Sequence, residues 1–152
     1  PTLCSIRIRI EQRVGAVNAG RTEPAERLVR GICAYVQYAR ENPEETRALL
    51  RTLDRPAPPS HPLNAGLRAD LEAGFASGRF RAPSTEAAVL LVGGLGLVLL
   101  SSVLDGRREA SDDGRLAAQT LGLLLTGLGL AYSEAQAVAG EATRDLIRGT
   151  PA

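Results

Sequence analysis

Residues 85–104 of the chain read TEAAVLLVGGLGLVLLSSVL, and residues 116–132 read LAAQTLGLLLTGLGLAY. The segment from Ala87 to Leu104 is a run of eighteen residues without a charge, and the second stretch adds seventeen more. A helix that is apolar around its whole circumference has to be buried on every side. A bundle of 152 residues covers one such helix easily and two with difficulty. The two runs therefore predict a helical pair that packs against the helices of a second copy; a monomer with two central core helices is the alternative.

A membrane hairpin is a further alternative for the same two runs. Eighteen residues of helix span about 27 Å at about 1.5 Å per residue, which is near the lower limit for crossing a bilayer. Glycines at positions 93, 94 and 96 dilute the hydrophobicity of the first run. The connecting residues 105–113 mix both signs of charge, without the excess of basic residues that marks a cytoplasmic loop. We therefore expect no membrane span.

The composition bounds the size and the class of the protein. With 152 residues, 44% apolar residues and a formal charge of +1, the chain has the size of one globular domain and no bias towards disorder or polyanion binding. Cys4 and Cys33 are the only cysteines and His61 is the only histidine, so neither a zinc site nor a disulfide framework is expected. The first ten residues carry Arg7 and Arg9 and lack the apolar core of a secretory signal. These features predict a cytoplasmic protein that uses no metal and no cofactor.

Apolar residues recur at intervals of three and four along the N-terminal half, which is the spacing of one helical face. Ile6, Ile8 and Ile10 also alternate like a short strand, but the helical pattern is longer. Glu23-Pro24 opens the second helix, and Asn42-Pro43 ends it and starts a short third one. The apolar positions of the first four helices are Leu3, Ile6, Ile10, Val14 and Val17; Leu28, Ile32, Tyr35, Val36 and Ala39; Leu49, Leu50 and Leu53; and Leu63, Leu67, Leu71 and Phe75. The predicted fold is an all-α helical bundle.

Polar residues predict where the last three helices begin. Ser84 or Thr85 is expected to cap the fifth helix, and Asp112 or Asp113 a sixth helix over about 114–128. Residues 133–136 (Ser-Glu-Ala-Gln) have the spacing of a capping box, which predicts the start of a final helix.

Motifs of catalysis are missing from the sequence. It contains no GxSxG, no P-loop, no metal-ligand spacing and no GxGxxG followed by a strand pattern. Gly93-Gly-Leu-Gly96 lies within an aliphatic run and has no Lys behind it, so a phosphate cradle is not expected there. The carboxylates of Asp112 and Asp113 lie in a predicted first turn, where they favour the helix dipole. We predict that the protein is not an enzyme.

Three phrases give the chain a resemblance to a known family. Residues 25–28 (AERL) open a helix that ends at residues 38–43 (YARENP), residues 71–80 read LEAGFASGRF, and residues 125–130 (LTGLGL) precede Ser-Glu-Ala at 133–135. In this order and at these separations, they resemble the C-terminal ligand-binding and dimerisation domain of the TetR/AcrR family of bacterial transcriptional regulators. The resemblance covers roughly residues 10–147. It implies a module that binds a small-molecule effector and forms a homodimer through a four-helix bundle.

The family reads DNA with a helix-turn-helix in its first three helices, and nothing in residues 1–20 resembles that element. Residues 1–20 are at best similar to the connecting helix that follows it, or a remnant of the link to a missing domain. Residues 21–152 then form the ligand-binding and dimerisation domain. The resemblance implies that DNA is bound only through an N-terminal domain that this chain does not contain.

The resemblance also implies positions for the two sites. The dimer interface maps onto the apolar pair, at Leu90, Gly93, Leu97, Leu100, Leu121, Leu124, Gly127 and Leu128. The effector pocket maps onto Ile32, Tyr35, Val36, Leu67, Leu71, Phe75 and Leu90. The few charges in this set imply an apolar or aromatic effector, with the hydroxyl of Tyr35 as its polar anchor. A purely structural helical module without a small-molecule site is the alternative function.

Overall fold

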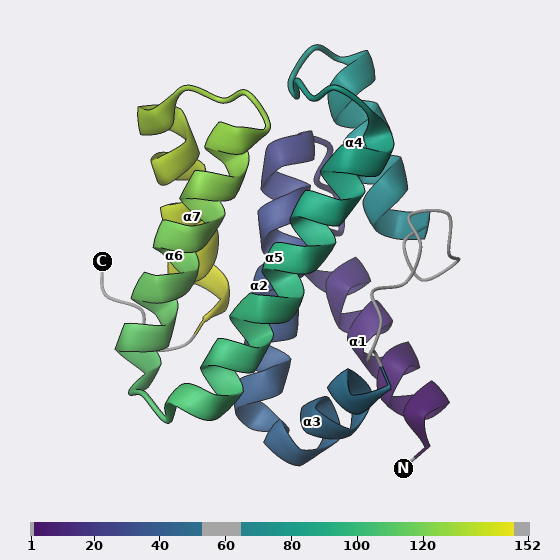
Figure 1. The fold of residues 1–152 in the computed structure, drawn as a ribbon, viewed down its shortest axis with the longest axis vertical. Helices are drawn as coiled ribbons and strands as arrows, with labels where there is room; N and C mark the ends of the chain where they lie inside the picture. The colour runs from purple at the N-terminus through teal and green to yellow at the C-terminus, as the bar shows by residue number, and fades with distance from the viewer. Residues whose placement is uncertain (1, 53–64, 148–152) are drawn as a thin grey trace.

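The computed structural model describes residues 2–52 and 65–147. These residues are folded as an all-α bundle without strands. Its helices are α1 (Leu3–Val17), α2 (Pro24–Glu41), α3 (Pro43–Arg51), α4 (Ala65–Ala76), α5 (Thr85–Gly106), α6 (Ala110–Gly127) and α7 (Tyr132–Leu146). In Figure 1, α5 and α6 lie side by side at the front, and α2 lies behind α5.

Helix α2 is the centre of the bundle and contacts each of the other six helices of the described chain. Its start follows from local chemistry, because the Glu23 side chain accepts hydrogen bonds from the N–H groups of Ala25 and Glu26, and Pro24 occupies the first turn. It ends before Asn42-Pro43, as predicted. Its fully buried side chains are Ala25, Val29, Cys33, Val36 and Ala39.

The C-terminal pair, α6 and α7, shares the most extensive helix contact of the bundle. Leu121, Leu124 and Leu125 of α6 are fully buried. Small side chains of α7, Ala135 and Ala139, are buried with them, and they let the two helix backbones approach closely. This pair therefore forms a core of its own beside α2.

Helix α1 packs against α2 and α3 at one side of the bundle. Ile6 and Ile10 are buried with Tyr38 of α2 in a small cluster. Arg30 of α2, which is only 7% exposed, forms a hydrogen bond to the C-terminal end of α1. The Nε of Arg30 donates to the Val17 carbonyl at 2.9 Å, and its Nη1 donates to the carboxylate of Asp145 on α7 at 2.6 Å.

Two of the predicted helix starts were wrong. Helix α6 begins at Ala110, and its first turn includes Asp112 and Asp113 instead of following them. Helix α7 begins at Tyr132 after Ala131, without a capping bond from a side chain, so the predicted capping box at 133–136 does not form. Ser84 does cap α5, by accepting a bond from the Ala87 N–H at 3.0 Å. The predicted positions Leu53, His61 and Leu63 lie outside the described residues.

Gly74 of α4 is a place where only glycine fits. A Cβ on Gly74 would lie 2.0 Å from Cδ2 of Phe80. The Phe80 ring is buried and packs edge-to-face on Phe75 with centroids 6.4 Å apart. The backbone N–H of Phe80 donates to the Gly74 carbonyl at 2.9 Å. Gly74 therefore allows the chain after α4 to fold back over the helix.

We expect Gly74→Ala to lower the free energy of unfolding by about 1–3 kcal/mol, because the aromatic ring has to leave its packed position. Gly15→Ala is the matched control, since a Cβ at this helical position meets nothing within 4 Å. It should raise stability by about 0.5–1 kcal/mol through helix propensity. Urea unfolding followed by circular dichroism measures both. Equal effects of the two substitutions would contradict the packing argument.

Candidate functional site

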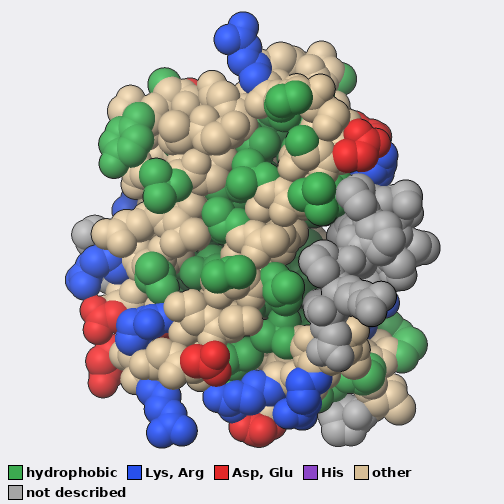
Figure 2. Space-filling view, in the orientation of Figure 1, with side chains coloured by type: hydrophobic (Ala, Val, Ile, Leu, Met, Phe, Trp, Pro, Cys, Tyr) green, Lys and Arg blue, Asp and Glu red, His purple; other side chains and the backbone are tan. Residues whose placement is uncertain are grey.

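Helix α5 is buried on one side and presents apolar side chains on the other. Its inner side includes Val92 and Leu99, which are nearly inaccessible. On the outer side, Leu90 is 55% exposed and Val98 is 68% exposed. Large apolar side chains at such exposure are informative when they gather into one patch. Figure 2 shows hydrophobic side chains gathered along the middle of the face over α5 and α6.

Helix α6 continues this patch. Leu123 is 62% exposed, and Gly127 is exposed one turn further along the helix. A Cβ on Gly127 would lie 3.5 Å from Cδ2 of Leu91, so the end of α6 lies beside the first half of α5. We call the exposed apolar surface of these two helices the α5–α6 face. It consists of Leu90, Leu91, Gly93, Gly94, Val98, Leu123 and Gly127.

The structure separates the predicted interface residues into two groups. Leu90, Gly93 and Gly127 lie on the α5–α6 face, and Leu97 is half-buried beside it. The others, Leu100, Leu121, Leu124 and Leu128, are buried within the chain itself and offer no surface to a partner.

Sequence reasoning missed four residues of this face, Leu91, Gly94, Val98 and Leu123. Inside a run of leucine, valine and glycine, the inner and outer sides of a helix have the same composition. Apolar residues occur on every side of the helix, and no polar residues mark one side as exposed. The sequence therefore contains no signal for which side faces outward.

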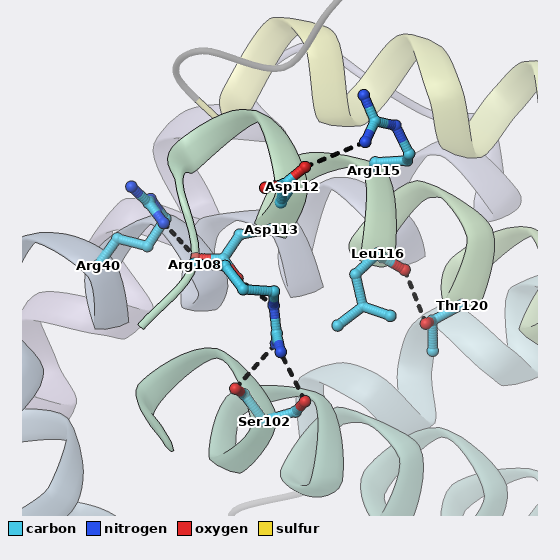
Figure 3. A network of polar contacts seen from close by, with 8 residues as sticks. All are labelled: Arg40, Ser102, Arg108, Asp112, Asp113, Arg115, Leu116 and Thr120. Carbon is cyan, nitrogen blue, oxygen red and sulfur yellow. Dashed lines mark hydrogen bonds and ion pairs between the residues drawn. The ribbon is translucent and has the colours of Figure 1, made fainter. Parts of the chain in front are cut away.

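A polar network holds the turn between α5 and α6 (Figure 3). Asp113 of α6 is 1% exposed and forms ion pairs with Arg40 of α2 and with Arg108 of the turn. Arg108 also donates to the backbone carbonyl of Ser102 at 2.9 Å and to its hydroxyl at 3.1 Å. Arg107, with φ of 49°, adopts the left-handed conformation that ends α5. One buried carboxylate thus connects α2, α6 and the end of α5.

The predicted effector residues differ in how far they are buried. Val36 and Leu71 are fully buried core residues. Ile32, Leu67 and Phe75 are partly buried and pack against that core. Leu90 belongs to the outer α5–α6 face instead.

The predicted anchor, Tyr35, already has a hydrogen-bond partner. Its hydroxyl donates to Oε1 of Glu11 at 3.0 Å, which connects α2 to α1. Burial raises the pKa of Tyr35, and the neighbouring Glu11 carboxylate raises that pKa further. The hydroxyl therefore stays protonated near neutral pH, and it faces α1. A ligand would have to compete with Glu11 for it.

Two hollows lie at the C-terminal end of α5. The first, of about 340 Å³, lies between α3 and α5 and is lined by Arg47, Leu50, Arg51, Ser101, Leu104 and Asp105. The second, of about 160 Å³, is lined by Ala39, Arg40, Pro43, Val103, Leu104, Arg107, Arg108 and Asp113. None of the predicted effector residues lines either hollow.

Residues 2–52 and 65–147 contain one helix with the length and composition of a membrane span. This helix is α5, and the core helices of soluble proteins can have the same length and apolar composition. Helix α6 starts with charged residues, and α5 is the sole candidate in that part of the chain. No group of three His, Cys, Asp or Glu side chains there is arranged to hold a metal ion. Cys33 is buried, and this burial raises the pKa of its thiol to about 12.

The described helices define the class of the protein as an all-α domain in which an apolar helical hairpin, α5–α6, lies against a central helix, α2. A family model described as the tetracyclin repressor-like C-terminal domain matches residues 23–149. The chain belongs to this family. The match begins after α1, at the residue that caps α2. Neither the search of curated proteins nor the search of solved structures gave a match.

Proposed function

We propose that this chain is the effector-binding and homodimerisation module of a bacterial TetR-like transcriptional regulator, acting in the cytoplasm. The observation that carries the proposal is the exposed α5–α6 face on a chain of this family. DNA would be bound in the full-length protein by an N-terminal domain. Residues 1–20, which include α1, would connect the two domains, and residues 21–152 would form the module.

The chemistry of the α5–α6 face favours a second copy as its partner. Leu90, Val98 and Leu123 expose aliphatic surface that is more stable when removed from water. Gly93 and Gly94 are exposed, and a Cβ at either would meet nothing within 4 Å, so another backbone can approach closely there. Two copies of one patch related by a two-fold axis give an isologous interface. Two antiparallel hairpins would then form a four-helix bundle.

Light scattering coupled to size-exclusion chromatography tests the dimer directly. We expect the purified chain at micromolar concentration to have twice the mass of the 16.0 kDa protomer. Removing the exposed aliphatic side chains of the α5–α6 face from water favours this association. A mass of one protomer at that concentration would remove the dimer from the proposal.

Effector binding is tested by thermal shift against apolar and aromatic compounds. A compound that binds the native state alone raises the unfolding midpoint by mass action. Stabilisation by members of the set would support the effector role. A dimer that no compound stabilises would indicate a structural helical module instead.

A further inference from the structure

The hollow between α3 and α5 has walls of different chemistry. Arg47 and Arg51 line it from α3, and Ser101 and Asp105 line it from α5. Leu50 and Leu104 supply its apolar surface, one from each helix. It has a volume of about 340 Å³ and is largely open to solvent. The mixture suits a compact ligand with an apolar body and one charged group.

The two guanidinium groups differ in how they are held. Arg47 donates to the Leu104 carbonyl at 3.0 Å and pairs with the exposed Glu44 at 2.6 Å, so it is fixed across the gap between α3 and α5. Arg51 is exposed and makes no ion pair or hydrogen bond with any described residue. One guanidinium is thus positioned by described residues, and the other makes no bond to them.

The spacing of Arg47 and Arg51 places two like charges close together. They lie four residues apart on one face of α3, where like charges destabilise a helix by about 0.2–0.5 kcal/mol. The dipole at the end of α3 compensates a cation in the last turn, but it does not remove the mutual repulsion. An anion between the two guanidinium groups would remove it.

The neighbourhood is also more positive than the chain as a whole. The first hollow and the adjoining second one share Leu104, and together their linings include five arginines and two aspartates. The whole chain has a formal charge of only +1. In Figure 2, basic side chains lie along the lower edge of the molecule, with acidic side chains among them. This local excess of positive charge attracts anions.

We propose that the α3–α5 hollow binds a small amphipathic carboxylate. The carboxylate group lies against the guanidinium of Arg51, beside Arg47, and the apolar body lies on Leu50 and Leu104. Asp105 on the opposite wall repels a second negative charge, so a monoanion is favoured over a dianion. This site is distinct from the predicted effector residues, and it does not depend on whether its ligand acts as an effector.

Benzoate is a suitable probe, with benzyl alcohol as a neutral analogue of similar shape and sulfate as a dianion without an apolar body. At ten times its dissociation constant, benzoate should raise the unfolding midpoint of the chain by about 3–5 °C. Benzyl alcohol and sulfate at the same concentration and ionic strength should leave it unchanged within about 1 °C. Titration calorimetry gives the dissociation constant.

Arg51→Gln tests the assigned contact, because this side chain is exposed at the end of α3 and makes no bond to any described residue. It should weaken benzoate binding about tenfold or more. Arg144→Gln, which removes an exposed arginine of α7, is the control and should bind as the unaltered chain does. The proposal is overturned if benzoate fails to bind, if Arg51→Gln binds it equally well, or if benzyl alcohol or sulfate matches its effect.

Discussion

Replacing Val98 with Glu should convert the proposed dimer into a monomer. Val98 is the most exposed of the large apolar residues of the described chain, at 68%, so the substitution removes no packing within the protomer. In an isologous interface it introduces two carboxylates, one from each copy. Burying a carboxylate without a partner costs several kcal/mol. We expect the dissociation constant to rise about 100-fold or more, since each factor of ten corresponds to about 1.4 kcal/mol.

Ile8→Glu is the matched control for this experiment. Ile8 is 53% exposed and carries a similar aliphatic side chain, but it lies on α1, which packs against α2 and α3. Sedimentation velocity over a range of concentrations compares the three proteins. A dimer that withstands Val98→Glu would take Val98 out of the interface. A dimer that dissociates with Ile8→Glu would instead place α1 in it.

Removing the carboxylate of Asp113 should cause a large loss of stability. Asp113 is 1% exposed and pairs with two arginines, from α2 and from the α5–α6 turn. Loss of one partner of a buried ion pair typically costs about 3–5 kcal/mol. Arg40 and Arg108 keep some access to water, at 23% and 33% side-chain exposure, which reduces that cost. We expect Asp113→Ala to lower the free energy of unfolding by about 2–4 kcal/mol.

The adjacent residue provides a control with the same chemistry at the surface. Asp112 pairs with Arg115 at 3.0 Å, and both side chains are about half exposed. Asp112→Ala should therefore change stability by less than about 1 kcal/mol. Urea unfolding at one fixed protein concentration compares the variants, because the stability of a dimer depends on concentration. Similar losses for Asp112→Ala and Asp113→Ala would show that the network in Figure 3 adds little to stability.

A double substitution separates the ion pair from other effects of Asp113. Arg40→Met removes the guanidinium from α2 and keeps its aliphatic length. If Asp113 and Arg40 stabilise the fold as a pair, Asp113→Ala and Arg40→Met together should cost less than the sum of the two single losses. Additive losses would mean that the carboxylate acts through Arg108 or through the backbone.

Local signals predicted the elements that depend on local chemistry. Helix α2 begins at Pro24 after the capping Glu23 and ends before Asn42-Pro43, because backbone geometry and capping bonds involve only neighbouring residues. The all-α fold and the family also followed from periodicity and from short phrases in order, and both were confirmed.

Predictions that required knowledge of distant partners were less successful. The start of α6 was misplaced because Asp113 resembles a helix cap in the sequence, whereas its carboxylate is bound by Arg40, 73 residues away. Tyr35 was predicted to be available to an effector, but its hydroxyl donates to Glu11 on another helix. In both cases a polar side chain had two chemically reasonable partners, and only the fold brings one of them within bonding distance.

The apolar segments 85–104 and 116–132 show which features follow from the sequence and which follow only from the tertiary structure. Their composition by itself predicted two helices that would be buried on most of their surface, because uncharged aliphatic side chains leave water when a partner surface exists. The tertiary structure decided which side of each helix is covered by the protomer. It buries Leu100, Leu121, Leu124 and Leu128, and it exposes Val98 and Leu123. In a helix that is equally apolar on every side, rotation about its axis is set by the packing of α2, α4 and α7, which no local pattern specifies.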